Sequence, residues 1–138
     1  MSQQQPWWNG AVIYQLIVRS YRDGNGDGIG DLQGLASRLP YLRWLGVEAI
    51  WLTPIYPSPL DDGGYDITDF KAIHPDLGDL AAFHRFLTAA HAQGLKVVMD
   101  LVMNHTSTLH PWFQRARWAP QGSPEREIYV WSDDPHRY

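Results

Sequence analysis

Three short apolar runs alternate with two amphipathic stretches along this chain, and that order restricts the possible folds more than any other feature. The runs cover 12–18, 47–52 and 96–102, and they are rich in β-branched and aromatic residues typical of strands. Apolar residues at three- and four-residue steps predict helical structure over 32–45 and 80–93. A strand–helix–strand–helix–strand order predicts a parallel sheet with right-handed crossovers, in the α/β class.

Capping residues mark the ends of both predicted helices. Asp31 and Asp79 precede them as suitable N-caps, and Gly46 and Gly94 follow them. Pro40 lies inside the first helical pattern and lacks a backbone donor, so we expect either a kink there or two short helices with Pro40 opening the second. The buried face of the later helix is predicted to consist of Leu80, Phe83, Leu87 and Ala90.

Two architectures begin with this order of elements, a doubly wound sheet and an eight-stranded barrel. The dinucleotide-binding form of the doubly wound sheet is disfavoured, because no G-x-G-x-x-G sequence joins the first apolar run to the first helix. Aspartates occupy that junction instead, and they would repel a phosphate. The periodicity alone leaves the two architectures open.

The composition narrows the class of partner. A formal charge of -4 and a pI near 5.8 argue against nucleic acid, whose phosphates require a basic face. The absence of cysteine excludes disulfides and thiolate metal sites, and it fits a reducing cytoplasm. The first ten residues lack the basic and apolar regions of a signal peptide, and the apolar stretch over 11–18 is too short to cross a bilayer. We therefore expect a cytoplasmic protein without a membrane partner.

Segment 23–31, DGNGDGIGD, has the oxygen-ligand spacing of a calcium-binding loop. Position twelve of an EF-hand is a glutamate, but here it is Gly34, so water would have to complete the coordination shell. A solvated turn stabilised by aspartate side chains is the alternative. The even spacing of the acids favours calcium as a cofactor. The expected ligands are Asp23, Asn25, Asp27, the carbonyl of Ile29, and Asp31.

Two later segments place polar residues after predicted strands, where β/α barrels form their active sites. Segment 61–66, DDGGYD, sets carboxylates beside Tyr65, and such a pair can hydrogen-bond sugar hydroxyls while the ring covers the apolar face of the sugar. A polar loop with a buried tyrosine is the alternative. Segment 100–105, DLVMNH, offers Asp100 and His105, which are either functional or structural.

Together, these three segments resemble the alpha-amylase family of glycoside hydrolases and glucosyltransferases. Segment 100–105 resembles the first signature region of that family, and 62–66 resembles its second-loop sugar site. The opening WWNGAVIYQLIVRSY is also similar, so the likeness covers essentially the whole chain. Segment 110–117 is shared with the oligo-1,6-glucosidases, whereas 123–135 is more similar to the trehalose synthase (maltose α-D-glucosyltransferase) branch.

The resemblance implies a fold and a set of substrates. Residues 1–105 would form the first three β/α units of a TIM (β/α)8 barrel, which is incomplete, and 106–138 would begin domain B, inserted after the third strand. The implied substrates are maltose, trehalose or other α-glucosides.

The resemblance also implies roles for single residues. Asp62 and His105 would hydrogen-bond a glucose unit, and Tyr65 would stack against it. Asp100 would steady the rim of the barrel. Asn104 would be a ligand of a second calcium ion.

No catalytic residue is expected in this chain. The retaining mechanism of the family needs an aspartate nucleophile and a glutamic acid. The nucleophile follows the fourth strand in a G-x-R-x-D segment that is absent here, and none of the three glutamates (Glu48, Glu125, Glu127) is suitably placed. We therefore expect an amino-terminal fragment that is inactive alone and self-associates through the open edges of its sheet. The alternatives are part of an oligo-1,6-glucosidase or α-glucosidase, and a non-catalytic calcium- or sugar-binding module.

Overall fold

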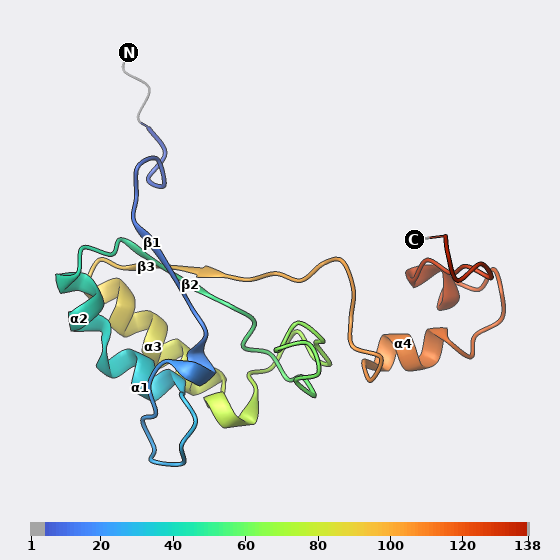
Figure 1. Ribbon diagram of the computed structural model, residues 1–138, viewed down its shortest axis with the longest axis horizontal. Coiled ribbons are helices and arrows are strands. Elements are labelled where there is room, and N and C mark those ends of the chain that lie inside the picture. Colours follow the sequence, from blue (N-terminus) through green and yellow to red (C-terminus); the bar gives the residue numbers. More distant parts are fainter. Residues whose placement is uncertain (1–4, 138) are drawn as a thin grey trace.

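A computed structural model describes residues 5–137 of the chain. Its sheet contains three parallel strands in the order β1-β2-β3, which leaves β1 and β3 as edges. The strands are β1 (Ile13–Leu16), β2 (Ala49–Leu52) and β3 (Lys96–Met99). Three helices lie together on one side of this sheet (Figure 1). They are α1 (Leu32–Ser37), α2 (Leu39–Trp44) and α3 (Leu80–Ala92). The predicted order of elements and the parallel pairing are confirmed.

Each strand is shorter than the apolar run that predicted it. The run over 12–18 continues past β1 into the 3-10 helix η1 (Val18–Ser20), and the run over 96–102 continues past β3. The three strands end at the same level of the sheet, because their last paired residues, Leu16, Leu52 and Met99, are partners of one another. The polar residues Thr53 and Asp100 follow β2 and β3 directly at the carboxyl edge of the sheet.

The first helical stretch is divided at the proline, as predicted. Pro40 lies in the first turn of α2, and Arg38 joins α2 to α1. The Asp31 carboxylate caps α1 by accepting a 2.6 Å hydrogen bond from the Gly34 amide. After α2, Gly46 adopts a φ of 87°, which allows the Val47 amide to bond back to the Leu42 carbonyl.

The core lies between the sheet and these helices. Ile50 and Leu52 of β2 are fully buried against the leucines of α1 and α2, and against Phe86 of α3. The predicted face of α3 is partly wrong, because Leu80 is 51% exposed whereas Phe86 is 1% exposed. Phe86 and Ala90 lie one turn apart on the side of α3 that packs against α1, and Leu80 lies in the first turn outside that stripe.

The other face of the sheet carries apolar side chains without a covering layer. Trp51 pairs in register with Gln15 and Val98, and it is 37% exposed. Ile13 on the edge strand pairs with Ala49 on the same face as Trp51 and is 44% exposed, whereas Tyr14 pairs with Ile50 on the helix-covered face and is 38% exposed. Successive residues of a strand point to opposite faces, so Trp51 is directed away from the buried Ile50 and Leu52.

The segment after β3 runs out as an extended stretch to a separate group of short elements (Figure 1). These elements are α4 (Pro111–Ala116) and the 3-10 helix η3 (Arg126–Ile128). The predicted domain ranges 1–105 and 106–138 include residues 1–4 and 138, which lie outside the described residues. The boundary between the two domains stays a prediction.

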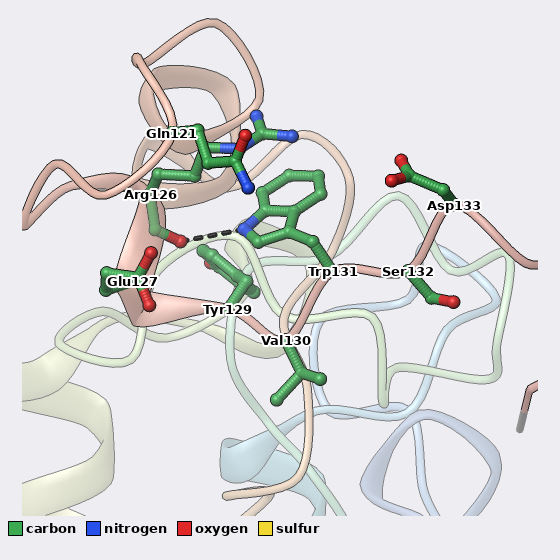
Figure 2. Close-up of a pocket in the computed structure, with 8 residues that line it drawn as sticks. All are labelled: Gln121, Arg126, Glu127, Tyr129, Val130, Trp131, Ser132 and Asp133. Carbon is green, nitrogen blue, oxygen red and sulfur yellow. Dashed lines mark hydrogen bonds between the residues drawn. The ribbon is translucent and has the colours of Figure 1, made fainter.

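Residues that follow α4 pack around an indole ring. The Trp131 ring is stacked on Phe113 at 5.9 Å between centroids, and the Arg126 guanidinium lies 4.1 Å from the Trp131 centroid. Trp131 Nε1 also donates a 2.7 Å hydrogen bond to the Arg126 carbonyl, drawn as a dashed line in Figure 2. Arg126 in turn donates to the carbonyls of Ala116 and Arg117, so this group fastens the tail onto the end of α4.

Candidate functional site

The loop after β2 meets the end of β3 through Tyr65 and Asp100. The Tyr65 hydroxyl donates a 2.9 Å hydrogen bond to Asp100 Oδ2. Burial raises the pKa of Tyr65, and the hydrogen bond and negative charge of Asp100 raise it further, with a smaller contribution from Asp62. Tyr65 therefore stays a neutral donor at physiological pH, and Asp100 is held by it.

Asp62 and His105 face one another at the same edge. Asp62 Oδ2 lies 4.0 Å from His105 Nε2, and both side chains are exposed, at 69% and 44%. Asn104 Nδ2 lies 3.3 Å from His105 Nδ1. The four residues expected to contact a sugar are thus brought together by the carboxyl ends of β2 and β3. Asn104 belongs to the same group through His105.

The sequence reasoning assigned no role to three residues that organise this edge. Tyr56 donates a 3.3 Å hydrogen bond to the Asp100 carbonyl, and Ser58 donates to the Asp66 carboxylate. Asp66 also accepts a 3.0 Å bond from the Asp61 amide. The DDGGYD segment contained Asp66, but its partner Ser58 lies eight residues earlier and carries no motif of its own.

Two hollows border the site. One has a volume of about 510 Å³ and includes Tyr65 together with Gln15 and Thr53, at the carboxyl ends of β1 and β2. The other has a volume of about 450 Å³ and places Asn104 and His105 beside apolar side chains. Its apolar lining comprises Phe70, Leu101, Val102, Met103, Trp112, Ile128 and Tyr129. Carboxylate, imidazole and phenol groups beside ring surfaces suit a ligand with hydroxyls on its rim and apolar faces, such as a sugar.

A third hollow, of about 420 Å³, surrounds Trp131 (Figure 2). Two lining rings, Tyr129 and the Trp131 indole, could stack on a sugar, but Tyr129 already packs edge-on against Phe113. Phe113 and Arg126 both lie against that indole, as described above. The ring is therefore engaged in packing, and this hollow is a weaker candidate for a sugar than the edge of the sheet.

In the glycine- and aspartate-rich segment, carboxylates organise the backbone. Asp23 accepts hydrogen bonds from the amides of Asn25, Gly26 and Gly28 at 2.6–3.0 Å. Asp27 accepts from the Ile29 amide at 2.8 Å. The amides of Gly28 and Gly26 hold the pKa of Asp23 below its usual value of 3.8, so this group is ionised at neutral pH.

The donor set of this segment suits a hard cation, because it consists of carboxylate, amide and carbonyl oxygens. The carboxylates are nevertheless occupied by backbone amides, and Asp31 caps α1. Over residues 5–137, no three acidic or histidine side chains converge as a metal-binding group. A cation would therefore use the remaining lone pairs of these oxygens together with water. Calcium stays a prediction.

Close packing requires three glycines here, two in this segment and Gly34 in α1. A Cβ atom on Gly34 would overlap the Arg22 carbonyl oxygen, and one on Gly30 would overlap the Val18 carbonyl oxygen. A Cβ atom on Gly24 would overlap the Gly34 amide nitrogen. The loop is thus pressed against η1 and the start of α1.

The structure is a parallel β/α sheet with polar side chains gathered at its carboxyl edge, which is the edge where β/α barrels form their active sites. Residues 15–137 match the family model described as alpha amylase, catalytic domain. The chain belongs to the alpha-amylase family, which is a family of enzymes. Its three-stranded open sheet is an incomplete barrel, as the resemblance implied.

Relatives with different activities resemble this chain to similar degrees. The trehalose synthase of Pimelobacter sp. (strain R48) is 49% identical over 138 residues, which are 100% of this chain and 24% of the relative. The glucan 1,6-alpha-glucosidase of Streptococcus dysgalactiae subsp. equisimilis is 51% identical over 133 residues, 96% of this chain and 25% of the relative. A crystal structure of a MutB mutant in complex with glucose superposes with a TM-score of 0.89 at 41% identity, and it covers 98% of this chain and 24% of that one.

The chain spans about a quarter of the length of these relatives. No helix within residues 5–137 is long and apolar enough to cross a membrane.

Proposed function

We propose that this chain is the amino-terminal part of a trehalose synthase, which interconverts maltose and trehalose. The proposal is carried by the group formed by Asp62, Tyr65, Asp100 and His105 at the carboxyl edge of the sheet. The choice of trehalose synthase rests on the similarity of 123–135 to that branch. It is supported by a trehalose synthase that aligns over the whole chain.

Each residue of the group has a proposed task. Asp62 and His105 hydrogen-bond hydroxyls of a glucose unit, because both are exposed and face one another across 4.0 Å. Tyr65 presents its ring to that sugar while its hydroxyl is held by Asp100. Asp100 thereby fixes the rim, since its carboxylate is bonded to Tyr65 and its carbonyl to Tyr56.

We propose that the 138 residues alone do not catalyse turnover. A retaining mechanism needs a nucleophile and an acid/base about 5–5.5 Å apart across the glycosidic bond. Asp100 is engaged by Tyr65. Glu125 and Glu127 lie in the tail beyond α4, and Glu48 precedes β2 at the opposite edge of the sheet. The 138 residues would thus bind a sugar without supplying the pair of acids that cleaves its glycosidic bond.

Calcium belongs to the proposal as a structural ion. Asp23, Asn25, Asp27, the Ile29 carbonyl and Asp31 would hold it, and it would neutralise three carboxylates in one short loop. Asn104 would serve a second ion. A cytoplasmic location is proposed as well, supported by the absence of cysteine.

An assay of the longer protein that carries these residues tests the proposal. With maltose as the substrate, trehalose should be the main product, and free glucose the minor one. Predominant glucose release from maltose or isomaltose would instead support the second candidate, a 1,6-α-glucosidase. That candidate is favoured by the 51% identity to the streptococcal enzyme.

A further inference from the structure

The loop that carries Asp62 is closed at its base by two side chains. The Ser58 hydroxyl donates to Asp66 Oδ1, and the Asp61 amide donates to Asp66 Oδ2 at 3.0 Å. The Leu60 amide donates to the Ser58 oxygen at 2.8 Å. Ser58 and Asp66 thus join the two ends of the loop and also bind backbone amides inside it.

The conformation inside the loop depends on that closure. Leu60 has a φ of 67°, and it is the one non-glycine residue with positive φ in the described part of the chain. Leucine rarely adopts this conformation, so neighbouring bonds must hold it. Gly63 and Gly64 follow with φ values of 60° and 102°. The Tyr65 amide then bonds to the Asp62 carbonyl at 3.0 Å.

The Asp62 side chain has little support of its own. Its side chain is 69% exposed, and its carboxylate approaches the His105 ring at 4.0 Å. An exposed carboxylate of this kind is placed mainly by the backbone that carries it. The orientation of Asp62 toward His105 is therefore set by the loop that Ser58 and Asp66 close.

We propose that Ser58 and Asp66 are positioning residues, which hold the Asp62 carboxylate opposite His105 for a sugar hydroxyl. The inference rests on the proposed function for the role of Asp62, but the closure of the loop is independent of it. Burial opposes ionisation of Asp66, yet the hydrogen bonds from Ser58 and from backbone amides outweigh burial and lower its pKa. Asp66 is thus an acceptor throughout the neutral range.

The first test measures hydrogen exchange of single amides in the 138-residue chain by mass spectrometry with residue resolution. Ser58→Ala should speed exchange of the Leu60, Asp61 and Tyr65 amides about five- to tenfold, since a net hydrogen bond is lost at the base of the loop. Ser58→Thr keeps the hydroxyl and should restore protection. Ser37→Ala is the control, because it removes a serine hydroxyl that donates to the Gly34 carbonyl at the end of α1, outside the loop. Unchanged protection of Tyr65 in Ser58→Ala would overturn the proposal.

The second test measures binding of methyl α-D-glucopyranoside in a double-mutant cycle. Ser58→Ala should weaken binding roughly fivefold in the parent chain, and it should have no further effect in an Asp62→Ala background. Equal weakening in both backgrounds would show that Ser58 acts without Asp62, which contradicts the proposal. If Tyr65 protection responds but Asp62→Ala leaves affinity unchanged, then the proposed sugar contact of Asp62 fails and the closure of the loop stands.

Discussion

Tyr65 and Asp100 lie 35 residues apart in the chain and are joined by a 2.9 Å hydrogen bond. This bond links the loop after β2 to the first residue beyond β3, so two polar segments become one surface. Tyr56 reinforces it by bonding to the backbone of Asp100. The Tyr65–Asp100 bond thus fixes the loop after β2 relative to the end of β3, and this position sets the geometry of the candidate site.

Tyr65→Phe is expected to destabilise the chain by about 1–2 kcal/mol, because its hydrogen bond to the Asp100 side chain is lost in a partly buried place. Urea denaturation followed by circular dichroism measures the change. Tyr14→Phe is the control, since it removes a hydroxyl from an exposed side chain on the edge strand. Equal stabilities of Tyr65→Phe and the parent would show that the bond to Asp100 contributes nothing.

Phe86→Ala should destabilise the chain far more than Leu80→Ala. Phe86 is 1% exposed in the core, and truncation of such a side chain costs about 3–5 kcal/mol. Leu80 is 51% exposed, and its truncation should cost less than about 1 kcal/mol. The same denaturation measurement compares them. A larger loss for Leu80→Ala would mean that α3 packs through the face predicted from the sequence.

The stability of the segment around α4 should fall as the pH drops below about 6.5. His110 is buried and its Nδ1 accepts a 3.0 Å hydrogen bond from the Trp112 amide, which requires the neutral ring. Burial lowers the pKa of His110 from 6.5, Arg115 lowers it further, and Asp69 opposes them. Because the pKa of His110 is lower in the folded state, the unfolded state binds the proton more readily. The contribution of His110 to the free energy of unfolding is therefore present above pH 6.5, and it is lost as the pH falls through the pKa of the folded state.

Comparison with His110→Asn isolates this effect. Asparagine can cap the helix without titrating, so the unfolding free energies at pH 7.5 and 5 should differ less in the variant than in the parent. Tryptophan fluorescence in urea provides the measurement. An identical pH dependence in the two proteins would assign the effect to other groups.

Calcium should raise the melting temperature of the chain, and Asp27→Ala should abolish that increase. The ion would neutralise Asp23, Asp27 and Asp31, which otherwise repel one another within nine residues. Asp133→Ala serves as the control, since it removes one acid from the tail near Trp131. A melting temperature of the parent chain that does not change with millimolar calcium would refute the site.

The chain is expected to self-associate through its uncovered strand edge, and Ile13→Lys should reduce that association. Ile13 is 44% exposed on β1, and a lysine on an edge strand opposes pairing with another edge. Sedimentation velocity over a range of concentrations measures the mass. Trp44→Lys is the control, because Trp44 is 79% exposed on α2. A monomer at all concentrations in the parent chain would contradict the expectation.

Periodicity predicted the sheet and the helices because each element buries one face, and the caps at Asp31, Gly46 and Asp79 are local signals. It misjudged the face of α3, since the position of a helix around its axis depends on its neighbour α1. It also missed α4, which has only six residues and is started by His110 and Pro111 rather than by an apolar stripe. Short elements depend on tertiary contacts that a periodic pattern does not contain.

The family resemblance named four residues of the candidate site, and the structure places them near one another after β2 and β3, while their contact with a sugar stays a prediction. What joins those segments was not predicted. The Tyr65–Asp100 bond, the Tyr56 contact and the Ser58–Asp66 closure all connect residues that are eight or more positions apart. Such partners are fixed by the path of the loop, which bends at Leu60 through a conformation unusual for leucine.

Gly24 and Gly30 of the DGNGDGIGD segment, together with Gly34 in α1, are required by packing rather than by the proposed ion. A methyl group at any of the three would overlap atoms already packed against it, so a chain without bound ion would still need hydrogen at these positions. Asp31 faces a similar demand, since it caps α1 whether or not a cation is held. A descendant that does not bind the proposed ion should therefore keep the three glycines together with Asp31.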